Sequence, residues 1–228
     1  MIGELGSALG LLLRGDPELW GIVARTLLVT GASTLISASI ALPVGAWLGG
    51  RGRRGLLLGL MSTGMALPPV VVGLFVAVLL ERQGPLGALN LLYTPQAMVI
   101  AQVIIATPVI AAVAAIAFEQ ADAELRAQLR ALGASRLRAT LMVARDIHRS
   151  LVVAVLAGFG SVMAEAGAAL IVGGNIAGQT RVMTTAIVLG TSQGDYAAAL
   201  ALGMLLVALT AFVNVAAALS RPARAGVA

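Results

Sequence analysis

The sequence predicts an all-α protein that crosses a membrane several times. Of its 228 residues, 59% are hydrophobic and only 11% are charged, and the mean hydropathy is +0.98. Soluble globular domains carry about 25% charged residues, so a chain this poor in charge is not of that class. Long uncharged stretches alternate with short arginine-bearing segments. At roughly 20 residues for each helical span, the chain has room for about five spans.

Missing residue types exclude several function classes. The chain has no cysteine, which excludes disulfides, a thiol nucleophile and thiolate metal sites. It has no lysine either, and a Walker A phosphate loop requires one, so the chain is not a P-loop ATPase. A single histidine, His148, cannot make a metal site by itself. We therefore expect no catalytic activity, no cofactor bound by this chain, and no nucleic-acid partner, because the arginines lie in short loops.

The first 20 residues predict an interfacial N-terminal helix. The apolar run from Gly6 to Leu13 is too short to span a bilayer. It lacks the basic flank of a signal peptide. The order Asp16-Pro17-Glu18 is typical of a helix start, with a capping side chain, a proline at the first helical position and an acid in the first turn. A second helix should begin there and continue into the first span.

Five apolar runs are the predicted spans. They cover residues 26–50, 55–80, 96–117, 151–172 and 197–219. We expect one transmembrane domain over residues 21–219 and a short tail over residues 220–228. If the polar segment 119–149 lies inside, eleven of the arginines are inside and four are outside. By the positive-inside rule this bias predicts an outer N-terminus and a cytoplasmic C-terminus and tail.

Glycine and proline mark special positions in the first two spans. Gly45 and Gly49 form a GxxxG pair, which favours close packing of another helix. Pro68-Pro69 must interrupt the second run, because proline removes a helical hydrogen bond. A broken helix at membrane depth needs protein or a water-filled cavity beside it. Pro68 and Pro69 therefore mark either a simple kink or the wall of a pathway.

The long polar interval, residues 119–149, predicts two short helices joined by a tight turn. Leu125, Leu129 and Leu132 recur at a spacing that places them on one helical face. The small residues Gly133-Ala134-Ser135 then break the pattern and allow a partner to come close. A second helical run starts at Arg136. The interval is either an ordinary cytoplasmic loop or a docking element.

Polar residues in and after the fourth span are the remaining candidates for function. Glu165 is the only acid well inside a predicted span, and burying it is costly, so it has either a functional or a helix-packing role. A glycine-rich segment follows, with these polar side chains: Asn175, Thr180, Arg181, Thr184 and Thr185. Hydroxyl, amide and guanidinium groups in such a setting suit an oxyanion. The alternative is a plain outer loop.

With a polar interval of two short helices joined by Gly-Ala-Ser, the chain resembles the permease subunits of ABC importers. Leu132-Gly133-Ala134-Ser135-Arg136 matches the centre of their cytoplasmic Glu-Ala-Ala…Gly signature. The flanks depart from it: residues 127–129 read Ala-Gln-Leu where the family has Glu-Ala-Ala, and the nearest upstream acid is Glu124. Residues 67–73, 84–87, 94–102, 158–160, 165–167 and 173–178 resemble molybdate and tungstate permeases. Residues 180–187 look most like the tungstate branch.

The resemblance implies a type I importer fold and its mechanism. Two permease copies would form the pathway above two ATP-binding subunits, which hold ATP and Mg, in a bacterial or archaeal inner membrane. An extracytoplasmic binding protein would deliver the oxyanion. The loop 119–149 would then carry the coupling helix, and the residues expected to touch the ATPase are Glu124, Leu132, Gly133, Ala134, Ser135 and Arg136. Those expected at the pathway or gate are Pro68, Pro69, Glu165, Asn175, Thr180, Arg181, Thr184 and Thr185.

Other functions stay open at this point. Tungstate is the substrate expected first, but a molybdate or sulfate importer fits the same pattern. A self-powered secondary transporter usually carries several intramembrane ionisable groups or inverted repeats, whereas this chain shows one such group and no convincing repeat. A membrane-embedded enzyme would need a catalytic constellation, and none stands out.

Overall fold

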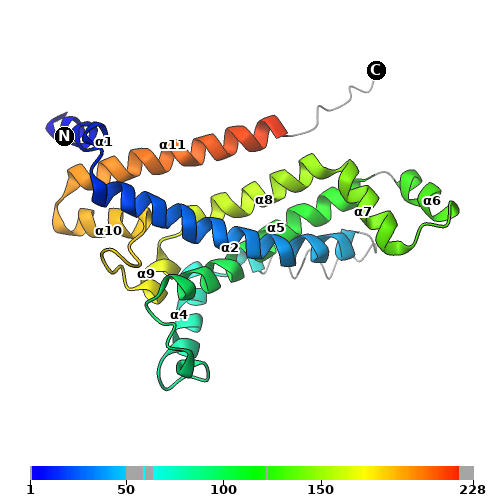
Figure 1. Ribbon diagram of the computed structural model, residues 1–228, viewed down its shortest axis with the longest axis horizontal. Coiled ribbons are helices and arrows are strands. Elements are labelled where there is room, and N and C mark those ends of the chain that lie inside the picture. The colour runs from blue at the N-terminus through cyan, green and yellow to red at the C-terminus, as the bar shows by residue number, and fades with distance from the viewer. Residues whose placement is uncertain (1, 50–58, 60–63, 122, 221–228) are drawn as a thin grey trace.

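The computed structural model describes residues 2–49, 59, 64–121 and 123–220 as a set of helices (Figure 1). They are α1 (Ile2–Arg14), α2 (Pro17–Gly49), α4 (Pro69–Leu80), α5 (Pro95–Gln120), α6 (Ala123–Ala131), α7 (Arg136–Asp146), α8 (His148–Met163), α9 (Gly167–Gly173), α10 (Met183–Gln193) and α11 (Tyr196–Ser220). A 3-10 turn covers Gly87–Leu89. No strand occurs in the described part of the chain, so the expected all-α class is confirmed.

Three helices, α2, α5 and α11, are long and apolar enough to cross a bilayer. The pair α7 and α8, bent by 78°, counts as a fourth if it is taken as one broken span. The shorter apolar helix α4 has 12 residues. The described residues thus hold three or four candidate spans plus α4, where about five spans were expected. Most of the segment before α4 lies outside the described residues.

The helix start predicted at Asp16-Pro17-Glu18 is present. Oδ1 of Asp16 accepts hydrogen bonds from the backbone N–H groups of Glu18, at 2.8 Å, and Leu19, at 3.2 Å. These contacts satisfy two donors that a helix start leaves open. Helix α1 ends before this point, and its Ala8 is fully buried in a cluster that includes residues of α11.

Helices α2 and α5 pack at unusually short range through the GxxxG pair. A Cβ atom at Gly45 would lie 2.7 Å from Cβ of Ala114, and one at Gly49 would lie 2.5 Å from the carbonyl oxygen of Ala115. Real side chains do not approach so closely, so only glycine fits at both positions. The sequence motif therefore marks a true helix–helix contact.

A buried stripe of hydroxyl groups extends the same contact along α2. Its members are Thr26, Thr30, Ser33, Thr34 and Ser37. Ser33 donates to Oε1 of Gln102 on α5 at 2.8 Å, and Ser37 donates to the carbonyl of Val103 at 3.3 Å. Interhelical hydrogen bonds of this kind hold helices together where lipid supplies no hydrophobic driving force.

Both interruptions of the membrane helices have identifiable causes. The break expected at Pro68-Pro69 is present, with Pro68 in an extended conformation just before α4. The single helix expected over residues 151–172 is wrong, because α8 ends at Met163 and α9 begins at Gly167. The Glu165 side chain accepts hydrogen bonds from the first N–H groups of α9, so it starts a new helix. Helix α10 also forms in the glycine-rich segment, where the sequence predicted no helix.

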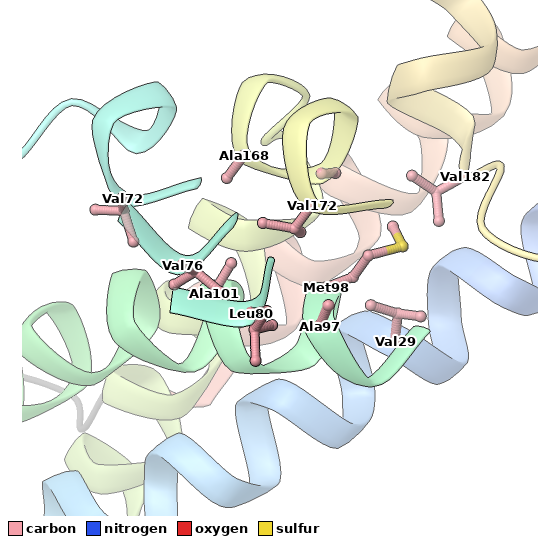
Figure 2. Close-up of a cluster of buried hydrophobic side chains, with 11 residues drawn as sticks. Val29, Val72, Val76, Leu80, Ala97, Met98, Ala101, Ala168, Val172 and Val182 are labelled. Carbon is pink, nitrogen blue, oxygen red and sulfur yellow. The ribbon is translucent and has the colours of Figure 1, made fainter. Parts of the chain in front are cut away.

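A hydrophobic cluster holds α4 and α9 against α5 (Figure 2). Met98 of α5 is fully buried in this cluster, together with Val72 and Val76 of α4 and Val172 of α9. The approach of α4 to α9 is again closest at a glycine, since a Cβ at Gly73 would lie 2.7 Å from Cα of Ala168. The two short helices that follow the breaks are therefore packed as a pair.

The helices give the molecule two distinct ends (Figure 1). Helices α6 and α7 occupy one end, and the C-terminal ends of α2 and α11 point toward it. Helix α1, the start of α2 and the connection between α10 and α11 lie at the opposite end. Below, these are called the α7 end and the α1 end.

Candidate functional site

The two helix breaks border one cavity of about 170 Å³. Its walls come from the segment before α4, from α4 itself, from α5 and from the end of α8. Pro69 and Glu165 both line it, whereas Pro68 does not. Most of the lining is apolar, including Val72, Ile105 and Val109. The structure thus brings together two of the predicted pathway residues that are almost 100 positions apart in the sequence.

Glu165 is fixed in place by several hydrogen bonds. Its Oε1 accepts from the N–H of Gly167 at 2.6 Å and from that of Ala168 at 3.1 Å. Its backbone carbonyl accepts from the hydroxyl of Thr184 at 3.0 Å, which connects the break to the start of α10. Two donors on one carboxylate oxygen make a strong, charge-assisted arrangement. The side chain is half-buried and still contributes to the cavity wall.

The polar residues after α9 form a single hydrogen-bonded connection between α9 and α10. Thr180 is buried, donates to the carbonyl of Gly173 and accepts from the N–H of Ile176 at 2.9 Å. Thr185 accepts from the N–H of Val182 at 3.1 Å, and the amide of Asn175 donates to the carbonyl of Thr185 at 3.3 Å. Most of the polar capacity of this segment is used within the segment itself.

Arg181 is paired with an acid that the sequence analysis did not connect to it. Its Nη1 lies 3.6 Å from Oε1 of Glu18, and its Nη2 donates to the carbonyl of Asn175 at 3.5 Å. Arg25 lies alongside, donating from Nε to the carbonyl of Arg181 at 3.1 Å. Among the described residues, Nε of Arg181 and Oδ1 of Asn175 are buried without a hydrogen-bond partner. These contacts join the guanidinium groups of Arg25 and Arg181 and the carboxylate of Glu18 in one cluster at the α1 end.

At the α7 end, the turn between α6 and α7 has the form that its sequence predicts. Gly133 adopts a left-handed conformation with φ of +79°. Ser135 then caps α7 by accepting from the N–H of Arg138 at 3.4 Å. Ala134 is half-buried and Arg136 is exposed. Glu124 lies in α6, but its side chain is outside the described set. Nothing lies within 4 Å of a Cβ built at Gly133, so the turn is open on that side.

Exposed leucines surround this turn, and the sequence analysis identified only one of them. Leu132 is 84% exposed and Leu137 is 70% exposed, with Leu141 also exposed one turn further along α7. Leu125 and Leu129 instead pack with Phe118 and Val143 in a small cluster that anchors the pair of helices. The spacing of Leu137 and Leu141 at i and i+4 is the signal that could have identified this second apolar face.

A metal site needs several ligating side chains grouped together. No group of three His, Asp or Glu side chains suited to a metal ion occurs in the part of the chain that the structure describes. Nδ1 of His148 lies 2.9 Å from the carbonyl oxygen of Arg145 near the α7 end, and only the ring nitrogen can be the donor in this contact. The arrangement instead offers an apolar cavity, a polar network between α9 and α10, and an exposed turn, which suit passage and docking.

Comparison with known proteins relates most of the chain to transport systems. The family model of binding-protein-dependent transport system inner membrane components matches residues 41–225. The tungstate uptake system permease protein of Peptoclostridium acidaminophilum is 36% identical, over 91% of this chain and 92% of that protein. A probable anion ABC transporter permease protein of Haloferax volcanii is 39% identical over 85% and 86%. The molybdenum transport system permease protein of Escherichia coli is 28% identical over 75% and 79%.

Proposed function

Since the chain belongs to the family of binding-protein-dependent transport system inner membrane components, we propose that it is the permease of a tungstate importer. The resemblance to ABC importer permeases that residues 132–136 indicated is thereby confirmed at the level of the family. The chain is a multi-pass inner membrane protein and a non-catalytic subunit of an oxyanion importer. Permeases of this family bind no cofactor themselves, and ATP binds to the partner ATPase.

The observation that carries the choice of tungstate is similarity over almost the full length of a tungstate permease. The 36% identity to that tungstate permease is higher than the 28% identity to the molybdenum permease of Escherichia coli. The guanidinium groups of Arg25 and Arg181 suit a tetrahedral dianion of either metal, whereas the nearby hydroxyl groups are used within the connection between α9 and α10. The two oxyanions differ little in shape, so the binding protein sets most of the discrimination.

Calorimetric titration of the partner binding protein tests this choice. We expect tungstate to bind at least about tenfold more tightly than molybdate or sulfate, which corresponds to roughly 1.4 kcal/mol. Equal or tighter binding of molybdate would reassign the importer to molybdate without changing the class of protein. If sulfate bound most tightly, both the tungstate and the molybdate assignments would be wrong.

We propose that the turn between α6 and α7 docks on the ATPase. Leu132 and Leu137 flank Gly133 on a surface that nothing else in the described chain covers. Exposed leucines next to arginines are typical of a docking surface rather than of a solvated loop. The cluster around Val143 and Phe118 would carry movement of this surface into α5 and α8. Ser135 and Arg136, which we expect to take part in coupling, are also exposed beside the turn.

The cavity supports a homodimer. Its wall includes exposed residues such as Met65, Leu67 and Ser161, so it opens at the surface of a single chain. An anion cannot cross a membrane along a groove that faces lipid, because lipid cannot solvate it. A second copy facing the first would close the groove into a pathway. Pro69 and Glu165 of each copy would then line the pathway, and Arg181 would lie near its outer mouth.

We expect the α1 end to lie outside and the α7 end to lie in the cytoplasm. The arginine bias supports this orientation, and Trp20 and Trp47 near the two ends of α2 are both about half exposed, as in interfacial aromatic belts. They are about 40 Å apart along the helix, close to the full width of a bilayer. Exposed Leu5 and Leu9 would hold α1 in the outer interface.

Reporter fusions test this topology. Fusions after Arg138 and Leu219 should report the cytoplasm, and fusions after Glu81 and Gln193 should report the exterior. The prediction follows from the positive-inside rule and from the separation of the two ends of the molecule. A fusion after Gln193 that behaves like the fusion after Arg138 would overturn the proposed orientation.

A further inference from the structure

The cavity wall carries a group that an anion pathway should avoid. Among the described residues that line the cavity, Ser161 is the only polar one besides Glu165, and the apolar ones include Val72, Ile105 and Val109. An apolar wall cannot replace the hydration shell of an anion, and a carboxylate on that wall adds repulsion. The described cavity is therefore poorly suited to bind an oxyanion and well suited to keep one out.

Helix capping alone does not account for a glutamate at this position. Glu165 caps α9 by accepting hydrogen bonds from Gly167 and Ala168 through one oxygen. A glutamine could accept both bonds with its amide oxygen and would have the same shape. Glutamine would lack the negative charge of the carboxylate. In Glu165 the two hydrogen bonds hold that charge beside the cavity.

The geometry also links Glu165 to α4, α9 and α10. Its carboxylate bonds to α9, and its backbone carbonyl accepts from Thr184 at the start of α10. Helix α9 packs directly on α4, where a Cβ at Gly167 would lie 2.5 Å from Cγ2 of Val70. Any shift of the α4–α9 pair therefore moves the carboxylate relative to α5, which forms the opposite wall of the cavity.

We propose that Glu165 is the resting-state barrier that prevents anions from leaking through the permease. In the closed state the carboxylate repels anions at a narrow apolar passage, and movement of α9 during transport displaces it. This inference rests on the proposed function, because a barrier against anions matters in an anion pathway. It assigns Glu165 to selectivity against leak rather than to substrate binding.

The test is passive anion flux through the assembled importer. Permease with its ATPase is reconstituted in liposomes without ATP and without binding protein, and chloride efflux is followed with an entrapped chloride-sensitive dye. Glu165→Gln should raise the leak by about tenfold or more, because the repulsion between unit charges a few ångströms apart is several times the thermal energy. Its melting temperature should stay within a few degrees of that of the wild type.

Two further variants separate charge from structural damage. Glu81→Gln removes an exposed carboxylate at the end of α4, outside the cavity, and should not change the leak. The double variant Ser161→Glu with Glu165→Gln returns a carboxylate to the same cavity wall and should lower the leak again. A double variant as leaky as Glu165→Gln would attribute the leak to a damaged fold and overturn the proposal.

Other outcomes are equally decisive. A Glu165→Gln leak equal to that of the wild type, with normal folding, removes the barrier role even if ATP-driven oxyanion uptake is intact. Conversely, the expected leak pattern in a complex that imports no oxyanion would support the barrier and reject the proposed substrate. Failure of the inference and failure of the proposed function therefore give different results.

Discussion

Leu137→Asp should lower ATP-driven uptake by about tenfold or more while the permease still folds and inserts. Leu137 is 70% exposed beside the turn between α6 and α7, so its replacement disturbs no internal packing. If the side chain is buried against the ATPase, losing it costs roughly 1.5–3 kcal/mol, and a buried unpaired carboxylate costs more. Uptake and ATPase activity in liposomes with both partner subunits measure the effect.

The matched control keeps the apolar contact. Leu137→Met should retain most of the uptake, because a methionine side chain of similar volume can fill the same pocket. Leu132→Asp, on the other side of Gly133, should repeat the loss. Gly133 itself is a less informative target, because its φ of +79° strains any bulky replacement whether or not the turn docks. Wild-type uptake by Leu137→Asp would remove this surface from the coupling interface.

Gly45→Leu should prevent α2 from packing on α5 and so leave little folded permease. The first added carbon would lie 2.7 Å from Cβ of Ala114 and 3.1 Å from two backbone atoms of α5. Backbone cannot move aside as a flexible side chain can, so the cost exceeds the 1–3 kcal/mol that is typical of overpacking. Yield and melting temperature in detergent, read by size-exclusion chromatography after heating, should both fall sharply.

Gly31 on the same helix supplies the control. Nothing lies within 4 Å of a Cβ built there, so Gly31→Leu should fold as the wild type does. Leucine has a higher helix propensity than glycine, so propensity alone would stabilise both variants. A loss of stability in Gly45→Leu but not in Gly31→Leu would therefore come from packing. Equal melting temperatures for Gly45→Leu and Gly31→Leu would show that α2 and α5 are not held by this contact.

Local sequence signals predicted much of the fold, because they act over a few residues. The Asp16 cap, the break at Pro68 and the GxxxG contact at Gly45 and Gly49 all appear where the sequence indicated. Each depends on a property of the residue itself: a capping oxygen, a missing N–H or a missing side chain. The hydrophobic runs likewise identified α2, α5 and α11.

The missed features depend on contacts between distant segments. Helix α10 starts where the N–H of Met183 donates to the hydroxyl of Thr26, at 2.9 Å, and these residues are more than 150 positions apart. The pairing of Arg181 with Glu18 has the same origin. The break at Glu165 depends on its side chain bonding to the following helix, whereas hydropathy records only an acid within an apolar run. No local pattern contains these partners.

The candidate site was predicted in part for the same reason. Proline and an intramembrane acid are unusual residues in a span, so Pro69 and Glu165 could be selected from sequence, and both line the cavity. Thr180 and Thr185 were selected for the same polarity, but their hydroxyl groups mainly hold the connection between α9 and α10. A polar side chain in a buried position needs hydrogen-bond partners, but the sequence does not show whether those partners belong to the protein or to a ligand.

This permease moves an oxyanion with work supplied by a partner ATPase. Uptake of radiolabelled tungstate into liposomes that contain the permease and its ATPase measures it most directly, with loaded binding protein outside and ATP inside. We predict accumulation against a gradient that stops when ATP, the ATPase or the binding protein is omitted. Accumulation by the permease alone, driven by an ion gradient, would contradict the account and identify a secondary transporter.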